Sequence, residues 1–241
     1  MILVLGASGY IGNNLYKSFL KEGFDVTGTY SNNKIDGLIH FDIRNMNLDK
    51  IKFNKKIRYV IIASGININI DNSKKDWKNS YYVNVTKTKI IIDYCFENNI
   101  IPIYISSDGV FDGLKGGYIE TDKKNPVNCY GTIKNEVEDY LLKSGNKFMI
   151  LRMGRVFGTD LCDDTIITNT IRQLKERKTL LCANDEIFTP LYIEDLCKAI
   201  IKLIRKRYEG VLHLISIESI SRYEIAKTIQ KYFNLRNIEI I

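Results

Sequence analysis

The stretch GASGYIG occupies residues 6–12 and directly follows the aliphatic run ILVL at residues 2–5. It places Gly6, Gly9 and Gly12 at three-residue intervals, and a helical pattern begins within it. Glycine is needed where a chain turns sharply out of a strand, where a pyrophosphate approaches the backbone, and where a helix packs closely on a strand. The N-terminus of the following helix adds free N–H groups and a partial positive charge. The stretch therefore predicts a dinucleotide-binding loop at the first strand–helix junction.

Short aliphatic runs alternate with helical patterns through the first half of the chain. Runs typical of buried strands occupy residues 2–5, 25–30, 59–63, 101–106 and 148–152. Patterns typical of helices occupy residues 10–23, about 76–98, and 129–145. This alternation predicts an α/β fold, a Rossmann-type doubly wound parallel sheet.

The pattern changes after Arg152. Helical patterns then occupy about 165–177, 193–206 and 221–233, with one strand at 210–215. We expect residues 1–152 to form the dinucleotide-binding domain that carries the catalytic residues. Residues 153–241 are expected to form mainly a smaller, mixed α/β substrate-binding lobe, and segments of the two parts are free to interleave. Such a lobe would lie at the carboxyl ends of the strands, where open α/β folds bind ligands.

Composition narrows the class of protein. With 241 residues and 45% hydrophobic content, the chain can bury a large core. No apolar run approaches the ~20 residues that a membrane span needs, and no basic signal-peptide region precedes the first glycine. The five cysteines are scattered without a C-x-x-C spacing, as in reduced cytosolic proteins. We expect a cytoplasmic protein with no membrane partner; because only two histidines exist, we expect no metal site.

The net charge of +7 and the pI near 9.0 raise the question of nucleic-acid binding. The basic residues concentrate in two amphipathic helical patterns, at 171–178 and 201–210. No helix-turn-helix, zinc-finger or aromatic RNA-binding motif accompanies them. We therefore interpret them as solvated helix faces and expect no nucleic-acid partner. The positive field also suits a small polyanion such as a nucleotide diphosphate.

The end of the second strand bears on the choice of cofactor. An acidic residue there would hold the ribose hydroxyls of NAD. The strand instead runs into TYSNNK, with no acid before Asp36. Ser31, Asn32 and Lys34 could receive a 2′-phosphate. We expect NADP(H) as the preferred cofactor, and Asp36 leaves NAD(H) as an alternative.

A Tyr-x-x-x-Lys spacing occurs three times, at residues 30–34, 130–134 and 223–227. The first lies in the loop assigned to cofactor phosphate. Only the second follows a predicted strand that ends in two serines, the latter being Ser107. In a doubly wound sheet the carboxyl end of a strand and the helix that follows face the same crevice. The pair at 130–134 is therefore the candidate catalytic pair, whereas the third is interpreted as a core tyrosine with a surface lysine.

Each member of this set has a chemical task. A phenol has an unperturbed pKa of about 10, and a cation one helical turn away lowers it. Tyr130 could then donate a proton to a carbonyl oxygen as hydride reaches the carbon. Ser107 would hydrogen-bond the same oxygen, and Lys134 would also hold the nicotinamide ribose.

Taken in order, these and further motifs resemble the extended short-chain dehydrogenase/reductase superfamily, and within it the dTDP-4-dehydrorhamnose reductase family. The motifs are GASGYIG, SSDGVFDG, YIETD, PVNCYGTIKNEVE, ILRMGRVFG, FTPLYIEDL, GVLHLIS and SRYEIA. They cover nearly the whole chain. The resemblance implies a Rossmann domain, NADPH or sometimes NADH, and reduction of the C4 ketone of a nucleotide-linked deoxysugar. It thus implies an oxidoreductase of deoxysugar and polysaccharide biosynthesis with a nucleotide-diphosphate sugar as substrate, and it is compatible with a homodimer.

The resemblance also assigns roles to single residues. The implied catalytic triad is Ser107, Tyr130 and Lys134. The implied cofactor-binding residues, beyond those at the end of the second strand, are Gly6, Ser8, Gly9, Tyr10, Ile11, Gly12, Asp42, Ile43, Ala63, Ser64, Gly65, Asn84, Tyr130 and Lys134. The implied substrate-binding residues are Ser107, Asp108, Gly109, Arg155 and Pro190.

Two positions depart from the family. It usually carries a tyrosine where this chain has Gly109 and a tryptophan where it has Arg155, and both positions are associated with gripping the sugar. The exchange of two aromatic rings for a guanidinium predicts a different sugar ring, more polar or anionic. Arg155 has a structural ion-pair role as its alternative. Segments 65–75 and 153–165 are expected to set substrate choice.

Three functions follow from these patterns. The first is an NADPH-dependent 4-ketoreductase of a nucleotide sugar. The second is an epimerase or dehydratase of the same superfamily, which ranks lower because Asp108 is not followed by the glutamate that a dehydratase usually carries. The third is a non-catalytic dinucleotide-binding subunit that modulates a partner enzyme, against which the intact Ser107, Tyr130 and Lys134 set argues.

Overall fold

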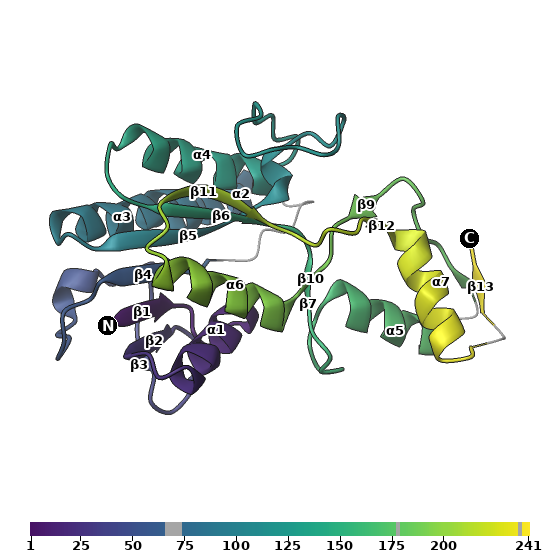
Figure 1. The fold of residues 1–241 in the computed structure, drawn as a ribbon, viewed down its shortest axis with the longest axis horizontal. Coiled ribbons are helices and arrows are strands. Elements are labelled where there is room, and N and C mark those ends of the chain that lie inside the picture. The colour runs from purple at the N-terminus through teal and green to yellow at the C-terminus, as the bar shows by residue number, and fades with distance from the viewer. Residues whose placement is uncertain (66–73, 177–178, 236–237) are drawn as a thin grey trace. The chain divides into compact units, whose positions relative to one another are not determined.

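The computed structural model describes residues 1–65, 74–176, 179–235 and 238–241 (Figure 1). It divides into two compact units. The first joins Met1–Arg152 to Ile200–His213, and the second joins Met153–Ala199 to Leu214–Ile241. Residues 200–213 complete the first unit because the strand within them joins its sheet, so the two parts of the chain interleave.

A seven-stranded sheet forms the centre of the first unit, in the order β11-β6-β5-β4-β1-β2-β3. Its strands are β1 (Ile2–Leu5), β2 (Val26–Tyr30), β3 (Ile39–His40), β4 (Tyr59–Ile62), β5 (Ile101–Ser107), β6 (Met149–Met153) and β11 (Gly210–Leu214). The pairs β1–β2, β1–β4, β2–β3 and β4–β5 are parallel. The predicted Rossmann-type fold is confirmed.

Helices cover both faces of this sheet. They are α1 (Tyr10–Lys21), α2 (Lys74–Tyr81), the π-helix η2 (Tyr82–Lys87), α3 (Thr88–Glu97), α4 (Cys129–Lys143) and α6 (Ile193–Arg205), with short 3-10 turns η1 (Leu48–Lys50) and η3 (Asp108–Val110). Leu3 and Leu5 of β1 share one core cluster with Ile133 of α4. Ile2 and Val4, which alternate with them along the strand, are also buried. β1 is therefore apolar on both faces, as central parallel strands are. Burial of each such side chain contributes roughly 2 kcal/mol.

The described residues of the second unit form two whole helices, the first part of α6 and three short strand pairs. The whole helices are α5 (Ile166–Glu176) and α7 (Arg222–Tyr232). Its strands are β7 (Val156–Phe157), β8 (Thr179–Leu180), β9 (Ile187–Phe188), β10 (Leu191–Tyr192), β12 (Ile220–Ser221) and β13 (Glu239–Ile240). They pair as β10–β7, β12–β9 and β13–β8. Leu174 and Ile225 bring α5 and α7 into one buried core.

Across the described ranges, no helix combines the length and apolar character that crossing a membrane requires. Within the same ranges, no group of three or more His, Cys, Asp or Glu residues is arranged to hold a metal ion.

Candidate active site

The glycine loop makes a tight turn between β1 and α1. Gly6 adopts a φ of +83°, a backbone conformation that side chains disfavour, and its N–H donates to Thr29 Oγ1 at 3.1 Å. The N–H of Gly9 donates back to the Gly6 carbonyl oxygen at 3.0 Å. A Cβ atom at Gly12 would lie only 2.1 Å from that oxygen. The first turn of α1 therefore presses directly on the loop, and residue 12 has no room for a side chain.

The loop has an open side suited to phosphate. Among the described residues, a Cβ at Gly9 would meet only the Gly6 oxygen, at 3.4 Å, within a 4 Å radius. No side chain among the described residues caps α1 at Gly9. The N–H groups of a first helical turn have no intrahelical acceptor, and they attract anions together with the helix dipole. The arrangement fits the pyrophosphate of a dinucleotide. Ser8, Tyr10 and Ile11 are half-buried around it.

The carboxyl end of β4 meets the same loop. A Cβ at Gly6 would lie 2.9 Å from the carbonyl oxygen of Ala63 and 2.9 Å from the backbone nitrogen of Ser64. The Ser64 hydroxyl is buried and has no hydrogen-bond partner in the described part of the chain. A Cβ at Gly65 would lie 2.5 Å from Asn84 Oδ1, so η2 approaches this strand end. The structure thus brings these predicted cofactor residues together.

The loop after β2 is open to solvent. Asn32, Lys34 and Asp36 are exposed and Ser31 is half-buried. The Ser31 hydroxyl donates to Asn32 Oδ1 at 3.4 Å. All four side chains are therefore accessible to solvent at this edge of the sheet.

Asp42 and Ile43 are less accessible for contact with adenine than the resemblance implies. Arg44 holds the Asp42 carboxylate with Nε at 2.9 Å and Nη2 at 2.8 Å, and this hydrogen bonding lowers the pKa of Asp42. The Ile43 side chain is buried in the core of the first unit. Contact of either residue with adenine remains a prediction.

Ser107 and Tyr130 border one small space. Ser107 is the last residue of β5, and Tyr130 is the second residue of α4. A Cβ placed on Gly109 would lie 3.5 Å from Ser107 Oγ and 3.6 Å from Tyr130 Cδ1. The Ser107 hydroxyl and the Tyr130 ring are therefore neighbours on either side of Gly109, the position at which the family usually has a tyrosine.

A cap and a close backbone approach fix the first turn of α4. The Asn128 side chain caps α4 by accepting the Gly131 N–H at 2.8 Å. A Cβ at Gly131 would lie 2.0 Å from the Gly109 carbonyl oxygen, so only glycine allows this approach. Gly131 is absent from the predicted site. A glycine inside a helical pattern costs about 1 kcal/mol relative to alanine, and that cost could have revealed its packing role.

The Ser107 hydroxyl is oriented by its neighbours. It accepts the Gly109 N–H at 3.1 Å and donates to Asp108 Oδ1 at 2.8 Å. Asp108 itself is exposed. The hydroxyl can exchange its donation to this carboxylate for donation to a ligand oxygen.

Lys134 lies between two phenol rings. Its Nζ donates to the Ile105 carbonyl oxygen at 2.8 Å. The same atom is 4.9 Å from the Tyr104 ring centroid and 5.6 Å from that of Tyr130. Burial lowers the pKa of Lys134 to about 8, and the negative charge of Glu138 opposes this change. When protonated, Lys134 favours the phenolate form of an adjacent tyrosine.

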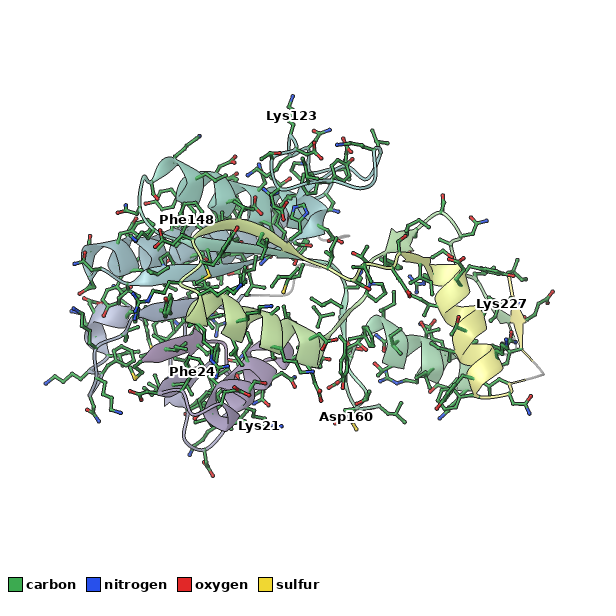
Figure 2. The ribbon with its side chains drawn as sticks, in the orientation of Figure 1. Lys21, Phe24, Lys123, Phe148, Asp160 and Lys227 are labelled. Carbon is green, nitrogen blue, oxygen red and sulfur yellow. The ribbon has the colours of Figure 1, made fainter. Side chains whose placement is uncertain are left out.

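The other Tyr-x-x-x-Lys pairs differ in their surroundings. Lys227 Nζ is 5.4 Å from the Tyr223 ring centroid, so the ring contact alone does not mark a catalytic pair. Tyr223 packs against the core of the second unit, and Figure 2 shows Lys227 on α7. Tyr30 packs on His40 at 5.3 Å between ring centroids. Tyr223 also follows a strand that ends in a serine, but the Ser221 hydroxyl caps α7 by accepting the Glu224 N–H, whereas Ser107 Oγ and the Tyr130 ring both border the position of Gly109.

Arg155 and Pro190 belong to the second unit. The Leu191 N–H donates to the Arg155 carbonyl oxygen at 2.8 Å, so the two segments run side by side. The exposed Arg155 guanidinium lies 5.4 Å from the Phe188 ring centroid. Among the described residues Arg155 has no ion-pair partner, which disfavours the structural ion-pair role. Most of segment 65–75 lies outside the described residues.

A buried ion pair beneath the site went unpredicted. Glu138 of α4 and Arg152 of β6 are 0% and 2% exposed. Arg152 Nη2 donates to Glu138 Oε2 at 2.8 Å. The sequence offered one indication of this ion pair, the single arginine at the end of the apolar run FMILR. A charge buried there needs a partner.

Comparisons with known proteins cover the whole chain. A family model described as the RmlD substrate binding domain matches residues 1–240. The chain is 28% identical over 233 residues to dTDP-4-dehydrorhamnose reductase of Aggregatibacter actinomycetemcomitans, covering 93% of this chain and 76% of that protein. It is 24% identical over 248 residues to methionine adenosyltransferase 2 subunit beta of Danio rerio, covering 100% of this chain and 76% of that protein. A solved structure of dTDP-4-dehydrorhamnose reductase from Bacillus anthracis in complex with NADP superposes with a TM-score of 0.83 and 25% identity, covering 100% of this chain and 83% of that one.

Proposed function

The chain belongs to the RmlD substrate binding domain family, and from that premise we propose that it reduces the 4-keto group of a nucleotide-diphosphate sugar with NADPH. It is an NAD(P)-dependent oxidoreductase of the extended short-chain dehydrogenase/reductase superfamily. The observation that carries the proposal is the shared space of Ser107 and Tyr130 around Gly109, with Lys134 one turn along α4.

The cofactor is held by backbone more than by side chains. The glycine loop and the N-terminus of α1 receive the pyrophosphate, as their open side supports. Ser64 and Asn84 line the adjoining strand end. Ser31 and Lys34 take the 2′-phosphate, a role supported by the lack of an acid before Asp36. When bound, NADPH supplies the hydride.

Tyr130 donates the proton in this proposal. As a new C–H bond forms at the ketone carbon, the carbonyl oxygen gains negative charge and takes the proton from Tyr130 Oη. The Ser107 hydroxyl donates a hydrogen bond to the same oxygen. Tyr130 is left as a phenolate, which protonated Lys134 stabilises. The product is an alcohol, and a solvent proton restores Tyr130.

Arg155 and Pro190 are proposed to bind the sugar. An exposed guanidinium with no ion-pair partner among the described residues can bind a carboxylate or hydroxyl-rich ring. The small Gly109 leaves room for a substituent that the usual tyrosine would exclude. Both features favour a polar or anionic sugar.

Deuterium transfer tests the reaction class. The protein is incubated with NADPH deuterated at the transferred position and a panel of nucleotide-linked 4-ketosugars, and products are analysed by mass spectrometry and NMR. A reductase yields one deuterium at C4 and one oxidised cofactor per product. An epimerase or dehydratase gives product without net cofactor oxidation, and that result would replace the proposal by the second function.

A regulatory subunit is the other candidate, favoured by the relatives named methionine adenosyltransferase 2 subunit beta. In that case the chain binds dinucleotide without turning over any ketosugar. Pull-down of a purified methionine adenosyltransferase catalytic subunit, with and without NADP, tests it. Stoichiometric binding together with inert NADPH would support this function over the reductase.

The cytoplasm is the proposed compartment. All five cysteines lie among the described residues and none of them forms a disulfide, as suits a reducing environment.

A further inference from the structure

One buried carboxylate connects four segments of the first unit. Glu138 of α4 is 0% exposed. Its Oε1 accepts the Ser106 hydroxyl at 2.6 Å, and its Oε2 lies 2.8 Å from Arg152 Nη2 and 3.2 Å from Lys124 Nζ. Ser106 belongs to β5, Arg152 to β6, and Lys124 to the segment between η3 and α4. Figure 2 shows the neighbouring Lys123 pointing away from the protein, whereas the Lys124 side chain is only 13% exposed.

The carboxylate shares a helix face with the catalytic pair. Tyr130, Lys134 and Glu138 are spaced at i, i+4 and i+8 on α4, so they line one side of it. On β5 the Ile105 carbonyl oxygen accepts Lys134 Nζ, and the Ser106 hydroxyl binds Glu138. The next residue is Ser107. Two consecutive bonds between α4 and β5 thus fix the register that places this serine against Tyr130.

Stability alone does not account for the network. Replacement of a buried ion pair by apolar side chains of similar volume is often neutral or stabilising. An apolar contact could therefore hold α4 on β5 without ionic groups. An apolar contact could not, however, supply a negative charge one helical turn from Lys134. That charge matters because desolvation disfavours the ammonium form of a lysine.

We propose that Glu138 is a positioning residue for the catalytic pair, which keeps Lys134 protonated and, through Ser106, holds Ser107 in register with Tyr130. The inference rests on the proposed function for its catalytic consequence. Its electrostatic part concerns Lys134 in the protein without substrate. The opposing effects of burial and Glu138 on the Lys134 pKa support it.

The surrounding charged and titratable groups are few. Lys134 faces Tyr130 and Glu138 on α4 and Tyr104 on β5. Glu138 faces Lys124 and Arg152. Beyond them, His213 Nε2 of β11 lies 3.2 Å from Arg152 Nη1, and Asp139 pairs with Lys124 at 2.6 Å. Of these groups, Glu138 supplies the negative charge that opposes loss of the Lys134 proton.

Lysine NMR tests the electrostatic part directly. Protein labelled with ¹³C at lysine Cε is titrated without substrate, and the resonance missing in Lys134→Arg identifies Lys134. We expect a midpoint near pH 8 in the parent and a midpoint lower by about 1 pH unit in Glu138→Gln. Asp139→Asn is the matched control, because Asp139 is the next carboxylate on α4 and also binds Lys124; its midpoint should equal the parent's. An unchanged midpoint in folded Glu138→Gln would overturn the proposal.

Ser106→Ala covers the case in which Glu138→Gln does not fold. It removes one hydroxyl and leaves Glu138 paired with Arg152 and Lys124. We expect kcat to fall about tenfold with NADPH affinity unchanged, and Ser106→Thr to restore it. A kcat of Ser106→Ala equal to that of the parent would refute the proposal that Ser106 holds Ser107 in register with Tyr130. If the parent itself turns over no ketosugar, the reductase proposal fails while the lysine titration still decides whether Glu138 controls Lys134.

Discussion

The charge of Lys134 depends strongly on its surroundings. Burial holds its pKa near 8, below the ordinary value of a lysine, so it loses its proton within the pH range in which the protein can be assayed. The proposed mechanism needs the protonated form, because the cation stabilises the Tyr130 phenolate. Reduction should therefore slow as pH rises through this pKa.

Lys134→Arg gives a sharp test of that dependence. Arginine keeps its charge throughout the assay range, so the alkaline decline centred near pH 8 should disappear from the kcat profile, whatever the loss in absolute rate. The kcat profile is measured between about pH 6 and 10 at saturating NADPH, a range that brackets the lowered lysine pKa of about 8. Persistence of the same decline in Lys134→Arg would assign it to another group.

Gly12 offers a second test at this scale. A Cβ in Gly12→Ala would meet the Gly6 carbonyl oxygen at 2.1 Å, which forces α1 away from the loop that receives the pyrophosphate. We expect NADPH affinity, measured by fluorescence, to fall at least about tenfold, or about 1.4 kcal/mol. Gly23→Ala is the control: its φ of +74° makes a side chain costly, but nothing lies within 4 Å of it. That variant should lose stability without losing affinity.

At the scale of elements, α4 depends on its N-terminal cap. The Asn128 side chain accepts the Gly131 N–H, one residue beyond Tyr130. Asn128→Ala should lower the free energy of unfolding by about 1 kcal/mol and also lower kcat, because the first turn that carries Tyr130 frays. Urea unfolding and steady-state kinetics measure the two effects.

Ser221→Ala is the matched control for that variant. Ser221 caps α7 in a capping box with Glu224, so its loss should cost a similar ~1 kcal/mol with kcat preserved. Equal losses of kcat in both cap variants would show that the effect of Asn128→Ala is one of general stability.

Long elements could be predicted from sequence and short ones could not. The runs ILVL and YVII carry enough apolar residues to reveal β1 and β4. Two-residue strands show no periodicity. β3 forms beside the longer β2, and those of the second unit pair with one another. The π-helix η2 interrupts the predicted helix at 76–98. The sequence could not reveal it, because an i→i+5 hydrogen-bond pattern leaves no mark in residue spacing.

The same limit applies to the site. The glycine loop and the Tyr130–Lys134 pair are local patterns, so the sequence placed them on their elements. The partners of Arg152 are not local: Glu138 is 14 residues away and His213 is 61 residues away. Only the folded sheet brings them together. Residues 200–213 are a further example, because their place in the first unit depends on which strand accepts β11 as a neighbour.

At the scale of the whole molecule, the two units are proposed to divide cofactor and sugar recognition. Arg155→Trp, which restores the residue usual in the family, should change the order of preference among nucleotide sugars and leave NADPH affinity within about twofold, well under the 1.4 kcal/mol that a tenfold change represents. Competition assays with neutral and anionic sugars measure the order of preference, and fluorescence titration measures the NADPH affinity. Unchanged kinetics and preference would mean that Arg155 does not contact the sugar.

The central claim is that this chain is a reductase whose proton donor is Tyr130. The most direct test follows NADPH oxidation by absorbance with a panel of nucleotide-linked 4-ketosugars, for the parent and Tyr130→Phe in parallel. We predict turnover of at least one sugar by the parent, a loss of roughly 10²–10⁴-fold in the variant, and equal NADPH affinity for both. Equal turnover by the two proteins would contradict the role of Tyr130, and tight NADPH binding without turnover by either would contradict the reductase itself.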